Sequence, residues 1–363
     1  MIARIRPWPV AVCAMLLLAS LVRPVAAQTP DAAKIAMLSG PDRERVIEEG
    51  ARKEGEVVWY CSLTENTVLR PLVQAFEKKY PFVKVTYWRG GSNAIIQKVT
   101  AELLAHAPVV DVVEGSGTAV PLIKAKAVLP FTSPHIADFQ EIYRDPRHLW
   151  AATRFSYYGL GYNTKLISKA EVPKTYEALL DPKWKGKMAW RVGDATGAEL
   201  MITAVRLTMG EAKGQAYLAK LAKQEPIPFT ASARALVNQV IAGEYPIGLN
   251  IFLHHPVYSA LKGAPSASQP IQPVPSTIGT IQLIRGVRHP YAAMLLIDFV
   301  LSPDGQTVMA KRNYLPGNSK VEPSAAQKTI IPRYNGTKEL FVSPEKLDEM
   351  RQSSAELFKK YFK

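Results

Sequence analysis

In the first third of the chain, apolar and polar residues repeat one pattern twice: a short apolar run, a polar loop and an amphipathic stretch. Residues 57–60 and 83–87 predict two strands, the second because its apolar side chains alternate. Residues 68–76 and 95–103 carry apolar side chains at the three- and four-residue spacing of a helix that buries one face. The pattern therefore predicts two consecutive strand–loop–helix units.

A third unit of the same kind follows directly. Residues 109–113 predict a strand, residues 114–117 a polar loop and residues 118–126 a helix. Asp111 interrupts the apolar run, which indicates either a strand end or an exposed face. Three such units in succession predict a parallel sheet with right-handed crossover connections.

The rest of the chain follows similar rules after an aromatic and glycine-rich segment, residues 154–161, which predicts a strand crossing between two lobes. The pattern further predicts strands at 188–191, 246–250 and 280–284, helices at 199–208, 231–242, 291–301 and 345–361, and a loop at 263–276. The predicted fold class is therefore α/β with two lobes.

Polar loops follow several of the predicted strands and precede helices. Open α/β sheets bind ligands at the carboxyl ends of their strands, and the free N–H groups of a helix start favour an anion. Hydroxyl, amide and guanidinium groups in these loops suit a carboxylate, phosphate or phosphonate. The side chains that we expect to contact a ligand are Ser62, Thr64, Asn66, Arg89, Ser92, Asn93, Ser116, Arg154, Tyr158, Arg191, Asp194, Thr196, Ser232 and Asn250.

These side chains also have structural interpretations. Thr64 or Asn66 can cap a helix, and Ser62 with Glu65 has the spacing of a capping box. The adjacent tyrosines at 157–158 can pack at a hinge. The sequence alone leaves these alternatives open.

The amino terminus predicts a secretory signal at residues 1–27. It combines the basic residues Arg4 and Arg6, an apolar run over 10–22 and small residues at 25–27. A transmembrane anchor is the alternative, but the apolar run is short of the about 20 residues that a span needs. We therefore expect an exported protein.

Composition adds two limits to this picture. The 363 residues suggest two domains, and removal of residues 1–27 leaves 42 basic and 31 acidic residues, a net charge of +11. The basic residues are scattered and do not cluster with aromatic ones, so we expect no nucleic-acid partner. Cys61 remains as a single cysteine in a predicted strand, which excludes an intramolecular disulfide and favours a buried, inert thiol.

The sequence gives little support to catalysis. It contains no G-x-S-x-G, H-E-x-x-H, paired-cysteine or P-loop pattern. Glu114 beside Ser116 can act as a general base, but a carboxylate at a strand end also binds a ligand amine or caps a helix. We expect no enzyme, no cofactor and no resident metal.

An ordered set of motifs resembles the bacterial extracellular solute-binding proteins of ABC importers, especially the ferric-iron-binding type. The motifs are Gly159-Leu160-Gly161-Tyr162-Asn163-Thr164, Asp181-Pro182-Lys183-Trp184-Lys185-Gly186-Lys187, His289-Pro290-Tyr291-Ala292-Ala293, Asp298-Phe299 and Leu301-Ser302-Pro303-Asp304-Gly305-Gln306. The resemblance implies a type 2 periplasmic binding fold, in which two lobes joined by a hinge close over a ligand. We expect a linker and helix at 28–55, one lobe at 56–153 plus 280–363, and the other at 154–279.

The resemblance also implies a site that this sequence lacks. The iron binders of the family carry a Tyr-Tyr pair shortly after the strand written here as residues 247–250. This chain has His254-His255 instead, and imidazole suits Fe(III) less well than phenolate does. Adjacent residues on a strand point to opposite faces, so we expect the histidine pair not to chelate a metal.

The predicted function is that of a monomeric periplasmic receptor. It captures a small anionic solute between its lobes and delivers it to an ABC permease in the inner membrane. A ferric-iron receptor is the alternative, and a secreted enzyme on the same fold is less favoured.

Overall fold

The computed structural model describes residues 31–193 and 196–362, so the predicted signal at 1–27 and Asp194 lie outside the described residues. The strands are β1 Glu56–Cys61, β2 Lys84–Arg89, β3 Val112–Gly115, β4 Val128–Leu129, β5 Ala151–Asn163, β6 Met188–Arg191, β7 Ile227–Phe229, β8 Ile247–Phe252, β9 Ser266–Gln269, β10 Val274–Ile284, β11 Leu315–Pro316 and β12 Glu339–Phe341. The sheet order is β2-β1-β3-β10-β5-β8-β6-β7, and β4, β9, β11 and β12 pair at its margins.

Helices surround these strands. The α-helices are α1 Ala32–Ala36, α2 Arg43–Glu54, α3 Arg70–Lys79, α4 Ser92–Leu104, α5 Ala119–Lys124, α6 Ala198–Met209, α7 Glu211–Ala222, α8 Ala233–Ala242, α9 His254–Ala260, α10 Pro290–Leu301, α11 Pro303–Lys311, α12 Ala325–Lys328, α13 Pro332–Asn335 and α14 Pro344–Phe362. A π-helical turn, η1, spans Glu65–Leu69, and 3₁₀ turns occur at η2 Ile136–Asp138, η3 Glu141–Tyr143, η4 Glu177–Leu180 and η5 Pro182–Trp184. No helix in the described ranges has the length and apolar character needed to cross a membrane.

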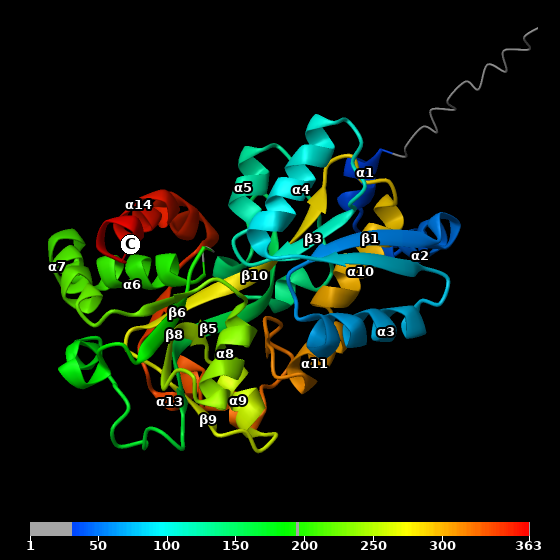
Figure 1. Ribbon diagram of the computed structural model, residues 1–363. Coiled ribbons are helices and arrows are strands. Elements are labelled where there is room, and N and C mark those ends of the chain that lie inside the picture. Colours follow the sequence, from blue (N-terminus) through cyan, green and yellow to red (C-terminus); the bar gives the residue numbers. More distant parts are fainter. Residues whose placement is uncertain (1–30, 194–195, 363) are drawn as a thin grey trace, which may run out of the picture.

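Figure 1 shows these elements in two groups, with β5 and β10 running between them. The first group holds β1–β3 with α1–α5, α10 and α11, and the second holds β6–β8 with α6–α8 and α14. In the first group β1 pairs in parallel with β2 and with β3, and in the second β6 pairs in parallel with β7 and β8. The three predicted strand–loop–helix units are therefore confirmed.

The two long strands differ from their predictions in extent. β5 covers the predicted crossing strand and extends it to 13 residues. β10 begins at Val274, six residues before the predicted start, and β9 forms at residues 266–269. The loop prediction for 263–276 is wrong at these positions because pairing with β5 and β12 forms strands that the local sequence does not favour.

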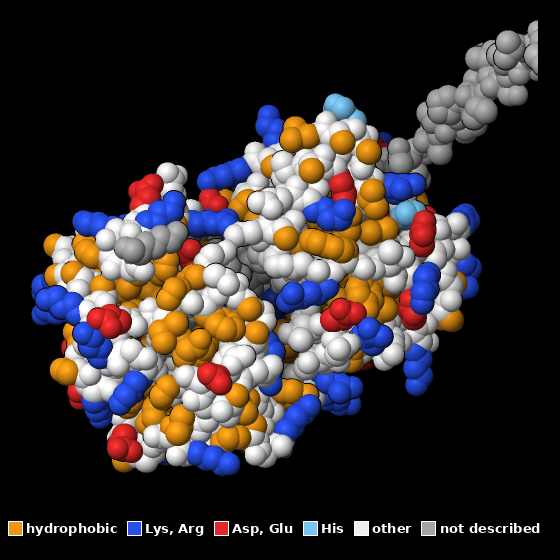
Figure 2. All heavy atoms as spheres, viewed as in Figure 1, with side chains coloured by type: hydrophobic (Ala, Val, Ile, Leu, Met, Phe, Trp, Pro, Cys, Tyr) orange, Lys and Arg blue, Asp and Glu red, His pale blue; other side chains and the backbone are white. Residues whose placement is uncertain are grey.

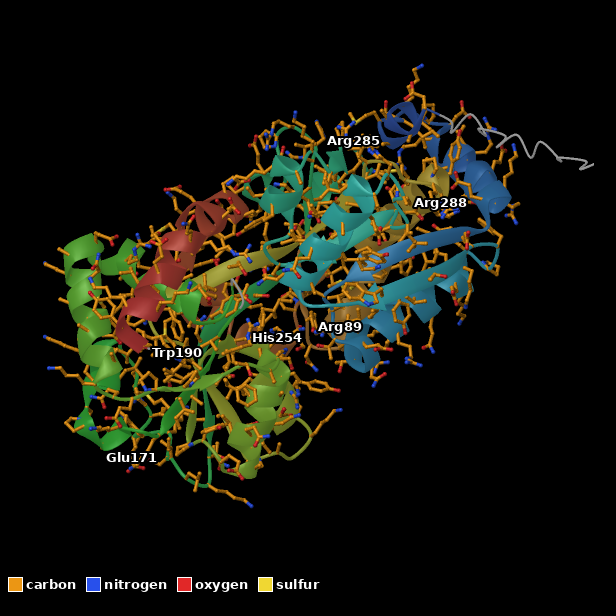
Figure 3. All side chains as sticks on the ribbon, turned by 45° about the horizontal axis from the view of Figure 1, so that its top comes forward. Arg89, Glu171, Trp190, His254, Arg285 and Arg288 are labelled. Atoms are coloured by element: carbon orange, nitrogen blue, oxygen red, sulfur yellow. The ribbon has the colours of Figure 1, made fainter. Side chains whose placement is uncertain are left out.

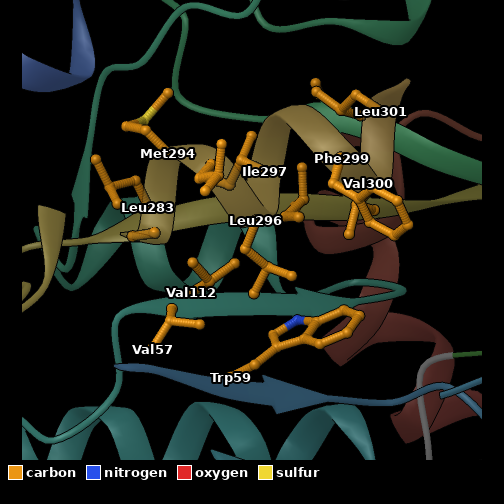
Figure 4. Close-up of a cluster of buried hydrophobic side chains, with 14 of the residues drawn as sticks. Val57, Trp59, Val112, Leu283, Met294, Leu296, Ile297, Phe299, Val300 and Leu301 are labelled. Carbon is orange, nitrogen blue, oxygen red and sulfur yellow. The ribbon is translucent and has the colours of Figure 1, made fainter. Parts of the chain in front are cut away.

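Each group has its own apolar core. Figure 4 shows the first, in which Trp59 of β1 and Val112 of β3 face Leu296 and Phe299 of α10. The second is built around Trp190 of β6, which is fully buried. Separate cores of this kind are what two domains require.

The C-terminal helix α14 contributes to the second core although the chain reaches it last. Its Leu357 and Phe358 belong to that core, and the Phe358 ring centroid lies 5.6 Å from that of Trp190. α14 also contacts α6, α7 and α5. We keep the predicted lobe boundaries at 154 and 280 as a proposal, and we propose that residues 344–362 belong with the second lobe.

Asp111 stands immediately before β3 and is fully buried, so the strand-end interpretation fits and the exposed-face interpretation does not. Its carboxylate accepts hydrogen bonds from the backbone N–H groups of Val58 at 2.8 Å, Arg288 at 2.8 Å and His289 at 3.2 Å. It also lies 2.8 Å from Nδ1 of His289. The hydrogen bond to Asp111 raises the pKa of His289.

Replacing Asp111 with Ala tests this cluster. We expect the free energy of unfolding to fall by about 3 kcal/mol, because the substitution leaves buried N–H groups without acceptors. Urea unfolding measures the change. The control is Glu49→Ala, which removes an exposed pair with Arg45 and should cost about 0.5 kcal/mol. Equal effects of the two substitutions would contradict the structural role of Asp111.

Candidate functional site

A cavity of about 770 Å³ lies between the two groups of elements, within the range of roughly 300–1,000 Å³ typical of ligand sites. In Figure 2 the molecular surface is hollowed between the two groups, with Lys and Arg side chains beside the hollow. The first group and β5 line the cavity with Ser62, Thr64, Glu65, Asn66, Thr67, Arg89, Gly91, Ser92, Asn93, Ala94, Ser116 and Arg154. The facing wall is formed by Arg191, Val192, Gly193, Thr196, Thr230, Ala231, Ser232, Ala233, Arg234, Phe252, His254 and His255. Tyr314, which belongs to the core of the first group, completes the lining.

The loop after β1 brings three predicted residues to the cavity. The Ser62 backbone N–H donates to the Glu114 carbonyl at 3.0 Å, and the Thr64 hydroxyl lies 2.9 Å from that of Tyr314. The side chain of Asn66 is exposed and makes no hydrogen bond to another described residue. The predicted capping box is not formed, because the chain enters η1 without a side-chain cap. All three residues line the cavity.

The start of α4 forms the next part of the same wall. Ser92 is its first residue, and no side chain caps it. Residues 91–94 line the cavity, and the free N–H groups of a helix start favour an anion. Arg89 is exposed at the end of β2 and donates to the Leu63 carbonyl at 3.4 Å. Asn93 donates to the Gly193 carbonyl at 3.3 Å. Asn93 therefore connects the two walls.

A buried ion pair forms the floor between these loops. Arg154 of β5 pairs with Glu114 of β3, and both side chains are at least nine-tenths buried. The guanidinium also donates to the hydroxyls of Ser62 at 3.2 Å and Ser116 at 3.5 Å. Burial lowers the pKa of Arg154. Glu114 is thus occupied with a cation, and the structure gives it no arrangement suited to a general base.

Cys61 lies beside this pair and is buried. Burial raises the pKa of its thiol to about 12, so at neutral pH it carries its proton and is a poor nucleophile. This agrees with the prediction of an inert thiol.

The facing wall combines a strand end with a helix start. Arg191 ends β6 and donates to the Thr196 hydroxyl at 2.5 Å. Ser232 caps α8 by accepting a hydrogen bond from the Ala235 N–H at 3.2 Å. The first turn of α8 lines the cavity. The starts of α4 and α8 thus both reach the cavity, one from each wall.

Two predicted site residues serve the fold instead. Asn250 has φ 45° and donates to the carbonyls of Thr196 at 3.3 Å and Gly197 at 2.8 Å, so it holds the loop that carries Thr196. Tyr158 is fully buried, and its hydroxyl lies 3.0 Å from that of Thr277. Neither lines the cavity, and we remove both from the expected ligand contacts. For the other described candidates, ligand contact stays a prediction.

His254 and His255 line the cavity although they were not expected to contact the ligand, because the prediction placed them on a strand. β8 ends at Phe252, and the two histidines begin α9. The prediction that they point to opposite faces is wrong: both are buried, and their ring centroids lie 4.5 Å apart. Figure 3 shows His254 near the middle of the molecule, not far from Arg89. The sequence before α9 contains no capping residue that would have predicted the start of this helix.

Arg234 and Tyr314 were also missed. Arg234 stands in the first turn of α8, and its guanidinium donates to the His255 carbonyl at 3.2 Å. Tyr314 immediately precedes β11 and lines the cavity. Only the tertiary fold brings both residues to the cavity.

The electrostatics of the cavity favour an anion. Its described lining contains four arginines, Arg89, Arg154, Arg191 and Arg234, and one acidic residue, Glu65. Glu65 pairs with Arg70 at 3.0 Å. Among the described residues, no group of three or more His, Cys, Asp or Glu side chains is placed to hold a metal ion. The arrangement can therefore bind an oxyanion with guanidinium, hydroxyl and backbone N–H donors.

Comparison with protein families supports the relationship inferred from the motifs. Residues 62–307 match the model of the bacterial extracellular solute-binding proteins. An uncharacterized protein of Haemophilus influenzae is 30% identical over 73% of this chain and 78% of that protein. The Fe(3+)-binding periplasmic protein of Serratia marcescens is 26% identical over 59% of this chain and 62% of that protein.

Solved structures share the fold. The periplasmic binding protein AfuA of Actinobacillus pleuropneumoniae, with fructose-6-phosphate bound, has a TM-score of 0.71 at 24% identity, covering 84% of this chain and 99% of AfuA. Iron-bound HitA of Pseudomonas aeruginosa has a TM-score of 0.72 at 19% identity, with the same coverage. These likenesses confirm the predicted two-lobed type 2 periplasmic binding fold.

Because His254 and His255 are buried, we expect the free energy of unfolding to decrease at acidic pH. Burial, followed by the nearby charge of Arg154, lowers the pKa of His254 to about 3, and burial lowers that of His255 well below its usual value. An unfolded histidine titrates near about 6.5. Below that pH the unfolded chain binds protons that the folded chain does not, so stability falls as the pH falls.

We expect His254→Gln to reduce this loss of stability between about pH 7.5 and about pH 5, as measured by urea unfolding at each pH. The control is His106→Asn, at an exposed residue with φ 54°, a conformation that Asn tolerates. A pH dependence unchanged by His254→Gln would show that this imidazole does not stay neutral in the fold.

Proposed function

Because this chain belongs to the bacterial extracellular solute-binding protein family, as its motifs predicted, we propose that it is a periplasmic receptor for a small anionic organic solute. The family is non-enzymatic, and its members bind a small ligand for an ABC transporter. We further propose that the solute is anionic and that the protein is exported through a cleavable signal at 1–27. The protein is then a monomer that delivers its solute to a permease in the inner membrane.

One observation carries the proposal: arginines and two helix starts meet in the cavity from opposite walls. Arg89 and the first turn of α4 lie on one side, and Arg191 with the first turn of α8 lies on the other. Charge-assisted hydrogen bonds from guanidinium are among the strongest that proteins make to carboxylate and phosphate. An anion between the walls gains donors from both, so it favours the closed arrangement of the lobes.

The remaining polar groups suit an organic solute that carries hydroxyl or other polar groups beside its anionic group. Ser62, Thr64 and Asn66 offer hydroxyl and amide groups, and the cavity of about 770 Å³ exceeds what a single phosphate fills. AfuA was solved with fructose-6-phosphate, so a sugar phosphate is a rational first probe. Aliphatic phosphonates and dicarboxylates are the next.

Ferric iron is the second candidate, and the relatives' names favour it. The Serratia marcescens relative is an Fe(3+)-binding protein, and HitA was solved with iron bound. The donors in this cavity argue the other way. Tyr314 is the single tyrosine in its described lining, the Tyr-Tyr pair is replaced by His254-His255, and four arginines repel a trivalent cation unless an anion accompanies it.

Replacing Arg89 with Gln tests the anion proposal. Arg89 is exposed and belongs to no ion pair among the described residues, so its loss should leave the fold intact. Losing one charge-assisted contact should weaken binding about 10- to 100-fold, as measured by calorimetry with sugar phosphates, phosphonates and dicarboxylates. The control is Arg285→Gln, at an exposed arginine that donates to the Lys126 carbonyl at 2.8 Å.

A second measurement separates the two candidates. A solute present at about a hundredfold excess over its Kd should stabilise the fold by about 2.7 kcal/mol and raise the melting temperature. Stabilisation by Fe(III) with a visible absorption band, and none by any anionic organic solute, would replace the anion proposal with the iron one.

A further inference from the structure

A second cavity, of about 230 Å³, lies away from the one between the two walls. It is enclosed by β5, by residues 315–323 after α11, by α13 and by β12. None of its lining residues lines the first cavity. It is therefore a separate feature that the proposed function does not use.

Strand β5 forms a wall of both cavities. Successive side chains of a strand point to opposite faces, and Arg154 faces the first cavity while Phe155 and Tyr157 line the second. β5 is also the strand that pairs with β10 along one half and with β8 along the other. The second cavity thus lies behind the segment that joins the two groups of elements.

Two buried tyrosines present their hydroxyls to this cavity. Tyr143 is 8% exposed and Tyr157 is 5% exposed, and neither hydroxyl has a hydrogen-bond partner among the described residues. By contrast, the hydroxyl of Tyr217 donates to the Tyr176 carbonyl at 2.9 Å. Both tyrosines line the cavity, and a phenol hydroxyl can donate or accept a hydrogen bond. The two phenols are therefore placed to bind a polar group inside the cavity.

Opposite charges lie at the same cavity. Arg333 of α13 and Glu339 of β12 both line it, and neither forms an ion pair within the part of the chain that the structure describes. Arg333 donates only to the Tyr334 hydroxyl, at 3.3 Å, and Glu339 accepts from the Ser276 hydroxyl. A guanidinium and a carboxylate around one small space suit a ligand with a carboxylate and an ammonium group.

The remaining lining combines apolar side chains with the polar residues Gln140, Asn318 and Ser319. Tyr143 and Phe155 pack edge to face with ring centroids 4.5 Å apart, and Leu315 and Ile331 complete this side. A dry cavity of roughly 150 Å³ holds benzene, so 230 Å³ admits a somewhat larger molecule. We propose that the second cavity binds a small zwitterionic amino acid, with its apolar side chain among these walls and its charged groups at Arg333, Glu339 and the two phenols.

Calorimetry with L-leucine and L-phenylalanine tests the proposal. We expect saturable binding of at least one of them at concentrations up to about 10 mM. Glu339→Gln and Arg333→Gln should each weaken binding by about tenfold or more, and Tyr157→Phe, which removes one hydroxyl, by about three- to tenfold. Tyr162→Phe is the matched control, because Tyr162 is also buried without a hydroxyl partner among the described residues but lies outside the cavity.

Two further comparisons identify the chemical class of the ligand and the cavity in which it binds. 3-Phenylpropionate lacks the ammonium group and phenethylamine lacks the carboxylate, so both should bind more weakly than L-phenylalanine. Arg89→Gln should leave amino acid binding unchanged, which separates this site from the proposed anion receptor. Absence of saturable binding by both amino acids, equal binding of the analogues, or loss of binding in Arg89→Gln would each overturn the proposal.

Discussion

The antiparallel pairing of β5 with β10 is the constraint on which the rest of the molecule depends. β10 pairs with β3 on its other side, and β5 continues past its bulge to pair with β8 and β9. β5 thereby belongs to both groups of elements: it pairs with β10 along one half, and its Leu160 and Tyr162 enter the second core from the other half. The main cavity lies between the groups, which are connected by these strands, by the contacts of α14 and by the hydrogen bond from Asn93 to Gly193.

The buried ion pair of Arg154 and Glu114 reduces the net positive charge at the floor of the cavity. A lone guanidinium at this depth would be costly, because burial penalises an unpaired ion, and Glu114 offsets that cost. Arg154 holds the loops that carry Ser62 and Ser116 through its hydrogen bonds. Because Glu114 neutralises it, Arg154 adds little to the positive potential of the cavity. Arg89, Arg191 and Arg234 then supply most of the attraction for an anion, from both sides of the cavity.

The sequence predicted those parts of the fold that local patterns determine. The three units of the first group follow from apolar spacing. Asp111 left a strand end and an exposed face as alternatives, and its burial just before β3 decides for the strand end. Long-range pairing decided the rest. The polar segment 266–276 enters the sheet only because β5 and β12 offer partners, and Asn250 supports a backbone loop that no spacing rule identifies. His254 and His255 reached the cavity through a helix start that had no capping signal.

The position of α14 has a consequence for the order in which the protein can fold. Its Leu357 and Phe358 complete the core around Trp190, its Arg351 donates to Asn93, and its Asp348 lies 2.5 Å from Lys124 of α5. A chain that emerges amino end first presents these residues last. The second core therefore stays open until almost the whole polypeptide has emerged, while the strands of the first group can already be paired.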